Sequence, residues 1–192
     1  MNHINTVTLT GLVHHLGRKK DSKYFPFSVR HESTWTEGTT RKDFLNARAF
    51  SADVQEKLAS LQENTPVRVN GELRTSKGSG ELYLAVLGAE ALESLPAVPE
   101  NSVQLSGNVH FVKAQAEGET GSGKYVRFAV RQESQDSQGR IQRDFLVVRV
   151  FDEEQRKILE ALNDGDPVKV NGTLRSSRGS GVNYVLCVKI EK

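Results

Sequence analysis

The chain contains one long stretch that is written twice. VRVNGELRTSKGSG at 67–80 returns as VKVNGTLRSSRGSG at 168–181, a shift of 101 residues. In a chain of 192 residues, a self-match of this length indicates a duplicated unit, and this constrains the fold more than any local pattern does. Upstream the shift falls to 96, which relates Val7 to Val103. The second copy therefore carries five additional residues before Tyr125.

Size and composition limit the class of protein. Each copy has about 90 residues, near the lower end of what a single hydrophobic core supports without staples. The single cysteine, Cys187, excludes a disulfide framework and fits a reducing compartment. No apolar run approaches the length of a membrane span, and residues 1–11 lack the layout of a secretion signal, so we expect a cytoplasmic protein with no membrane partner. A net charge of +2 neither demands nor forbids a nucleic-acid partner.

The hydrophobic pattern of each copy predicts five strands and one helix. In the first copy the segments 6–13, 24–33 and 44–50 alternate apolar and polar residues, as strands with one buried face do. Residues 67–73 and 81–87 repeat this alternation on either side of a Gly-rich hairpin. The order is three strands, a helix and two strands.

The helix is predicted over 51–64, where apolar residues recur with helical spacing. Ser51 is placed to cap its N-terminus, and Asp152 takes that place in the second copy. Gln155 follows Asp152 by three residues, as in a capping box.

This order predicts an all-β chain of two tandem OB-folds, which are five-stranded barrels with one capping helix each. Gly11 and Gly71 stand in mid-strand, where small barrels bend sharply. The alternative is another small β domain with a helix. We expect the first barrel over 1–93, a Pro-containing linker over 94–100 and the second barrel over 101–192.

The third strand of each copy predicts a binding face. In the first copy Leu45 and its alternate neighbours supply the core, so Phe44, Arg48 and Phe50 point outward. The second copy repeats this set as Phe145, Arg149 and Phe151. Two exposed rings with a guanidinium between them can stack nucleobases, at about 1–3 kcal/mol per base, and contact phosphate. The alternative is that Phe50 and Phe151 pack under the helices.

Further cations fall out of phase with the apolar residues of their strands, and we expect them on the same outer surface, where they would attract a phosphate backbone. They are Arg30, Arg68 and Arg74 in the first copy and Arg131, Lys169 and Arg175 in the second. Lys77 and Arg178 stand at the tips of the two Gly-rich hairpins, which could hold a backbone or be ordinary hairpins.

Two sets of aromatic residues lie outside the third strand. Trp35 stands in a polar stretch, where a large ring needs a partner surface: a base, another subunit or its own barrel. The second copy has Asp136 there. Tyr83 and Tyr184 follow the hairpins and are interpreted as rings at the edge of the core.

The sequence offers no catalytic, cofactor or metal motif. GETGSGK at 118–124 matches G-x4-G-K, but Tyr125 replaces the required Ser or Thr and a strand follows where a phosphate-binding loop needs a helix. His14 and His110 occupy matched positions, yet no cysteine or carboxylate accompanies them at ligand spacing, so they are interpreted as surface or loop histidines. We therefore predict no cofactor.

Taken together, the layout resembles bacterial single-stranded DNA-binding protein. The motifs are V-x-L-x-G, then F-x-V-R-x-E-S, an aromatic-x5-Phe strand and V-x-V-x-G-x-L-R, twice over. The resemblance implies that Phe44, Phe50, Phe145 and Phe151 stack bases, although that family usually has Trp at the first position. Trp35 has a rough counterpart there, one residue out of register.

The resemblance also concerns assembly. A chain with two barrels is similar to the tandem variety of that family, which reaches four barrels as a homodimer. The acidic-tipped tail with which the family recruits partners has no counterpart here, so recruitment by that route is not expected.

The sequence thus predicts a non-enzymatic, sequence-tolerant binder of single-stranded DNA in replication, recombination or repair. One alternative, like primosomal OB proteins, is a protein-interaction module that contacts replication or restart proteins. A nuclease is the third possibility.

Overall fold

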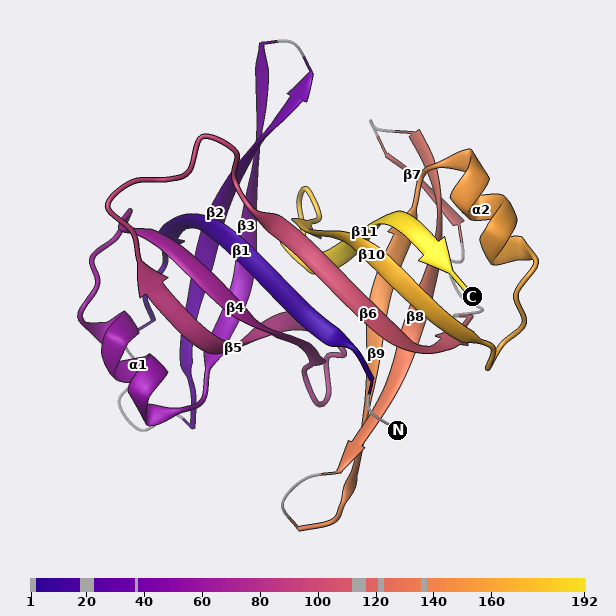
Figure 1. Cartoon of the computed structure of the whole chain (residues 1–192), viewed down its shortest axis with the longest axis horizontal. Coiled ribbons are helices and arrows are strands. Elements are labelled where there is room, and N and C mark those ends of the chain that lie inside the picture. The colour runs from indigo at the N-terminus through magenta and orange to yellow at the C-terminus, as the bar shows by residue number, and fades with distance from the viewer. Residues whose placement is uncertain (1–2, 18–22, 37, 112–116, 121–122, 136–137) are drawn as a thin grey trace.

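A computed structural model describes residues 3–17, 23–36, 38–111, 117–120, 123–135 and 138–192. Within these ranges the first half folds into five strands and one helix in the predicted order (Figure 1). The elements are β1 (Asn5–His14), β2 (Phe25–Thr36), β3 (Thr39–Ala49), α1 (Ala52–Ala59), β4 (Pro66–Thr75) and β5 (Leu82–Ala91).

The second half repeats this order with one additional strand. Its elements are β6 (Asn101–His110), β7 (Glu117–Thr120), β8 (Gly123–Gln135), β9 (Ile141–Val150), α2 (Glu153–Glu160), β10 (Pro167–Ser176) and β11 (Asn183–Glu191). The extra strand β7 pairs with the start of β8, from Glu117 opposite Val126 to Thr120 opposite Gly123. The described part of the longer loop in the second copy therefore forms two paired strands, and the described residues of the G-x4-G-K match, 118–120 and 123–124, lie in these strands rather than before a helix.

Strand pairing closes each half into a barrel. The order β2-β3-β5-β4-β1 is completed by a pairing of β1 with β2, and the second half is closed in the same way by β6 and β8. β3 and β5 are parallel, with Ala47 opposite Leu84, while the neighbouring pairs are antiparallel. This arrangement confirms the predicted all-β class and the two OB barrels.

Glycines stand where strands of a barrel pass closest to each other. A Cβ at Gly11 would lie 2.5 Å from the carbonyl oxygen of Arg30. At Gly71 it would collide with the carbonyl oxygen of Ala85, and the β4–β5 register shifts at this point by a bulge. The strands can bend this sharply only because these positions lack a side chain.

The helices are shorter than the predicted span of 51–64, because α1 ends at Ala59 and turns follow before β4. Ser51 is the N-cap residue by position but its side chain makes no capping hydrogen bond, whereas Asp152 accepts one from the Gln155 N–H at 3.0 Å. Gln155 does not complete a capping box, since its Oε1 accepts from the Ile190 N–H at 2.7 Å. No helix in the described ranges has the length and apolarity that a membrane crossing requires.

An approximate two-fold axis relates the two barrels. β1 pairs antiparallel with β6 so that Val7 lies opposite Val103, its own counterpart in the repeat. The contact between β5 and β11 likewise pairs Leu82 with its counterpart Asn183. Figure 1 shows β1 and β6 side by side between the barrels, the helices at opposite ends of the molecule and the β2–β3 and β8–β9 hairpins pointing in opposite directions.

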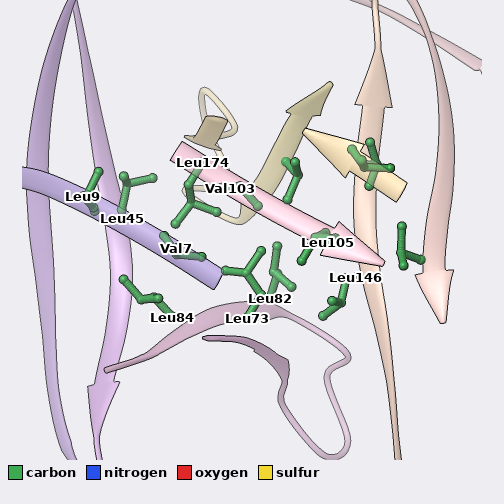
Figure 2. Packing of buried hydrophobic residues seen from close by; sticks show 14 of the residues in the cluster. Val7, Leu9, Leu45, Leu73, Leu82, Leu84, Val103, Leu105, Leu146 and Leu174 are labelled. Carbon is green, nitrogen blue, oxygen red and sulfur yellow. The ribbon is translucent and has the colours of Figure 1, made fainter. Parts of the chain in front are cut away.

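The hydrophobic core runs through both halves without a break. Val7, Leu9 and Leu45 in the first half and Val103, Leu105 and Leu146 in the second belong to one cluster of buried side chains (Figure 2). Leu73 and Leu174 lie in the same cluster, near the boundary between the barrels. The two barrels therefore share one packed interior.

Candidate nucleic-acid interface

Phe44 on β3 and Phe145 on β9 point outward, as period-two alternation predicts, and Phe50 and Phe151 each follow the last residue of these strands. Phe44 and Phe50 are 41% and 46% exposed, and Phe145 is 37% exposed. Phe151 is partly buried. The alternative in which Phe50 packs under the helix is wrong, because its ring lies on the outer face beside tyrosines.

In the first half an arginine is held among these rings. The Arg48 guanidinium carbon lies 4.0 Å from the ring centre of Tyr83 and 4.9 Å from that of Tyr24. The Phe50 ring centre is 5.6 Å from Tyr24 and 6.2 Å from Tyr83. Such cation–π contacts fix a guanidinium in place while its charge remains available to an anion. We call Tyr24, Arg48, Phe50 and Tyr83 the first aromatic cluster.

The second half builds the same cluster from the counterparts of these residues. Arg149 lies 4.0 Å from the centre of the Tyr184 ring and 4.9 Å from that of Tyr125, and Phe151 lies 5.2 Å from Tyr125. Arg149 also donates a hydrogen bond of 2.8 Å to the Ser177 hydroxyl. We call Tyr125, Arg149, Phe151 and Tyr184 the second aromatic cluster.

Sequence reasoning found only part of the two clusters. Tyr83 and Tyr184 are buried, which confirms them as rings at the edge of the core. The sequence pattern does not indicate their second role, as the surfaces on which Arg48 and Arg149 stack. The alternation of apolar residues does not identify Tyr24 and Tyr125 as cluster members. The signal that could have found them is their recurrence at matched positions in the two copies.

Each cluster lines a groove that also contains residues of its Gly-rich hairpin and of the other half. The groove of the first cluster measures about 560 Å³ and is also lined by Lys77 and by Gln142 from β9. The groove of the second measures about 460 Å³ and is also lined by Arg178 and by Arg41 from β3. Arg41 and Gln142 are counterparts, so each barrel contributes the same position to the groove of its neighbour.

Two of the predicted binding cations pair with aspartates of the other half. Arg175 donates to Asp43 at 2.9 Å and to the Ser33 hydroxyl at 2.8 Å, and Arg74 donates to Asp144 at 3.0 Å. These contacts cross between the halves. The expected placement on the outer surface is therefore wrong for Arg175, whose side chain is 12% exposed, whereas the Arg74 side chain stays 27% exposed. Both arginines pair across the halves because a buried carboxylate requires a cationic partner.

Asp43 accepts more hydrogen bonds than its counterpart. In addition to the Arg175 contact, Asp43 accepts bidentate hydrogen bonds from the Arg41 guanidinium at 3.0–3.2 Å. It also accepts a hydrogen bond of 2.9 Å from the Ser176 N–H. Burial by itself raises the pKa of the Asp43 carboxyl. The hydrogen bonds from Arg41, Ser176 and Arg175 outweigh it and hold that pKa below its ordinary value.

Three of the remaining predicted cations form ion pairs with acidic neighbours. Arg30 contacts Glu32 at 3.1 Å, Arg68 contacts Glu100 at 2.7 Å and Lys169 contacts Glu191 at 3.5 Å. Arg131 is partly buried on β8, directly opposite Phe145 of β9. Lys77 and Arg178 are exposed at the hairpin tips. The backbone of Trp35 lies in β2, but its side chain falls outside the description.

Among the described residues there is no group of three or more His, Cys, Asp or Glu side chains that could hold a metal ion. The one cysteine, Cys187, is buried, and burial raises the pKa of its thiol to about 12. The thiol is therefore protonated at neutral pH and is a poor nucleophile.

Comparison with solved structures supports the fold. The single-stranded DNA-binding protein from Thermus aquaticus is matched with a TM-score of 0.74 at 18% identity, over 100% of this chain and 94% of that one. A deletion mutant of the same protein is matched with a TM-score of 0.72 at 20% identity, over 99% and 94% of the two chains. No protein-family model matches the sequence, and no curated protein does. At these identities the likeness establishes a shared fold.

Proposed function

We propose that the protein binds single-stranded DNA without sequence preference. Bases stack on Phe44 and Phe50 in the first half and on Phe145 and Phe151 in the second, while Arg48 and Arg149 contact phosphates. Stacking tolerates every base because each has a π face, and arginines fixed on tyrosine rings supply charge without reading base edges.

One observation carries the proposal: two matched grooves each combine an exposed or partly exposed phenylalanine with an arginine that is stacked on tyrosines. A groove built only for packing would bury these rings. The Thermus aquaticus protein that shares the two-barrel fold is itself a single-stranded DNA-binding protein.

The experiment is a titration of a labelled dT oligomer of about 30 nucleotides, since an OB-fold covers up to about 16. Fluorescence anisotropy is recorded over a series of salt concentrations. We expect affinity to fall as salt rises, and to fall at least tenfold in the Phe44→Ala/Phe145→Ala variant at about 1–3 kcal/mol per lost stack. Phe44→Trp/Phe145→Trp should bind more tightly than the natural chain because the indole is the larger ring.

Lys157→Ala is the control, since Lys157 lies on α2 in an exposed pair with Glu153. It should bind like the natural chain. Affinity that ignores salt, or an alanine variant that binds normally, would contradict the proposal. A protein without catalytic activity leaves labelled DNA intact in magnesium or manganese, and cleavage there would instead favour a nuclease.

We further propose that the protein acts in the cytoplasm, in DNA replication, recombination or repair, as a homodimer with four barrels. Leu87 on β5 and its counterpart Val188 on β11 are 63% and 62% exposed, and a second copy would cover them. Light scattering should give twice the chain mass, and Leu87→Asp/Val188→Asp should give the monomer mass. A monomeric natural chain would exclude the dimer.

A further inference from the structure

Phe44, the exposed phenylalanine in the middle of β3, lies outside the first aromatic cluster and has a ring partner on another strand. The His14 ring, at the end of β1, has its centre 4.9 Å from that of Phe44, and the two planes are tilted by 50°. β2 runs between these strands. The two rings therefore form a corner on the outer face of three adjacent strands, and the centre of the His15 ring lies 4.0 Å from that of His14.

The second half contains the same corner. The centres of the His110 and Phe145 rings are also 4.9 Å apart, with a tilt of 56°. His14 and His110 are related by the shift of 96 residues, whereas Phe44 and Phe145 are related by the shift of 101. The insertion between them has thus left the contact between the rings unchanged. A repeated geometry across such an insertion indicates a shared requirement rather than a chance contact.

A carboxylate lies beside each histidine ring. Glu63 accepts a hydrogen bond of 2.8 Å from the backbone N–H of His15 and lies 3.5 Å from Nδ1 of His14. In the second half Asp164, the counterpart of Glu63, accepts from the Phe111 N–H at 2.9 Å and lies 3.4 Å from Nδ1 of His110. Because the acid faces Nδ1, the orientation of the ring is set on that side.

Small residues on the intervening strands make room for the corner. Ser28 of β2 pairs with His14 on one side and with Asn46 on the other, and it is buried although it lies on the outward face. Ala129 of β8 takes the same place beside His110 and is fully buried. The side chains of His14 and His110 themselves remain 27% and 38% exposed.

We propose that each His–Phe corner is a binding subsite for one unpaired nucleobase. The base stacks on the face of the phenylalanine, and its edge contacts the tilted imidazole, as in edge-to-face aromatic pairs. This inference rests on the proposed function and extends the interface from β3 and β9 to β1 and β6. His14 and His110 contact the base, and Glu63 and Asp164 are positioning residues.

The test replaces the imidazole in two ways. His14→Leu/His110→Leu keeps bulk over Ser28 and Ala129 but removes the ring, and His14→Phe/His110→Phe keeps a ring. Each leucine substitution should weaken the affinity for the dT oligomer about threefold to tenfold. The phenylalanine variant should have an affinity within about twofold of that of the natural chain. The dependence of affinity on salt should be unchanged in both, because no phosphate contact is lost.

An NMR titration of the natural chain gives a second readout that needs no variant to fold. The Hε1 resonances of His14 and His110 should shift on addition of the dT oligomer, through the ring current of the stacked base. They should not shift with an abasic oligomer of the same length, which has the same phosphates.

Several outcomes would overturn the inference while leaving the proposed function intact. They are normal binding by the leucine variant, a reduced salt dependence in that variant and equal resonance shifts with the abasic oligomer. The first means that the histidines only cover the strands, and the other two mean that they contact phosphate. Failure of the natural chain to bind dT at all would instead refute the proposed function.

Discussion

Individual side chains in this molecule are fixed by partners that lie far away in the sequence. His31 is an example: it is 2% exposed, and its Nδ1 lies 2.8 Å from the Thr10 carbonyl oxygen, so it donates a hydrogen bond there. Burial lowers the pKa of His31 below its ordinary value, and the field of Arg175 adds to this, while the Thr10 hydrogen bond and the nearby Asp43 and Glu32 partly oppose it.

His31→Gln should therefore weaken the pH dependence of stability. In the natural chain the unfolded state binds a proton at His31 near the ordinary histidine pKa of about 6.5, and the folded state does so only at lower pH. The free energy of unfolding is therefore highest above about pH 6.5 and falls as the pH drops below about 6.5. The second half has Gln132 at this place, where its amide donates to the carbonyl oxygens of Ile4 and Ser106.

The measurement is the urea midpoint at pH 7.5 and at pH 5.5. The natural chain should lose more of its free energy of unfolding between these values than His31→Gln does. Identical losses would show that His31 has no part in the pH response.

At the scale of elements, the two halves differ in how their helices begin. The N-cap backbone is extended in both, with φ −75° and ψ 142° at Ser51 and φ −66° and ψ 132° at Asp152. Only Asp152 uses its side chain as a cap. A carboxylate at this place also interacts favourably with the positive end of the helix dipole.

Ser51→Asp should therefore stabilise the protein, by about 0.5–1 kcal/mol, because the carboxylate can accept from the Val54 N–H as Asp152 does from Gln155. Asp152→Ala should cost about 1 kcal/mol. Both values come from urea unfolding at neutral pH. If neither Ser51→Asp nor Asp152→Ala changes the free energy of unfolding, the helix caps do not limit stability.

At the scale of the whole molecule, the two barrels complete each other. Asp43 of the first half accepts hydrogen bonds from Arg175 and Ser176 of the second. Asp144 of the second half accepts hydrogen bonds from Arg74 and Thr75 of the first. Both carboxylates are buried. Each half therefore supplies the hydrogen-bond donors that the other half needs to bury its aspartate.

Asp43→Asn should be strongly destabilising, by about 3–5 kcal/mol, because it removes the charge that Arg41 and Arg175 share inside the interface. Asp144→Asn should cost less, since Arg74 keeps its contact of 2.9 Å with Glu72. Both effects are measured by urea unfolding at pH 7. Equal and small losses would show that the interface does not depend on these pairs.

The sequence by itself determined what depends on local periodicity and on the repeat. The alternation in 44–50 placed Phe44 and Phe50 outward, and the order of strands and helix predicted the barrel, because burial of apolar side chains follows chain geometry. Only the tertiary structure decided how charges pair. Arg74 and Arg175 have the phase of surface residues, yet the β1–β6 pairing brings the other barrel against them, and electrostatic partners are set by distance in space. The stacking of Arg48 on Tyr24 and Tyr83, and the tilted contact of His14 with Phe44, were decided in the same way, since these contacts join residues that are far apart in the sequence.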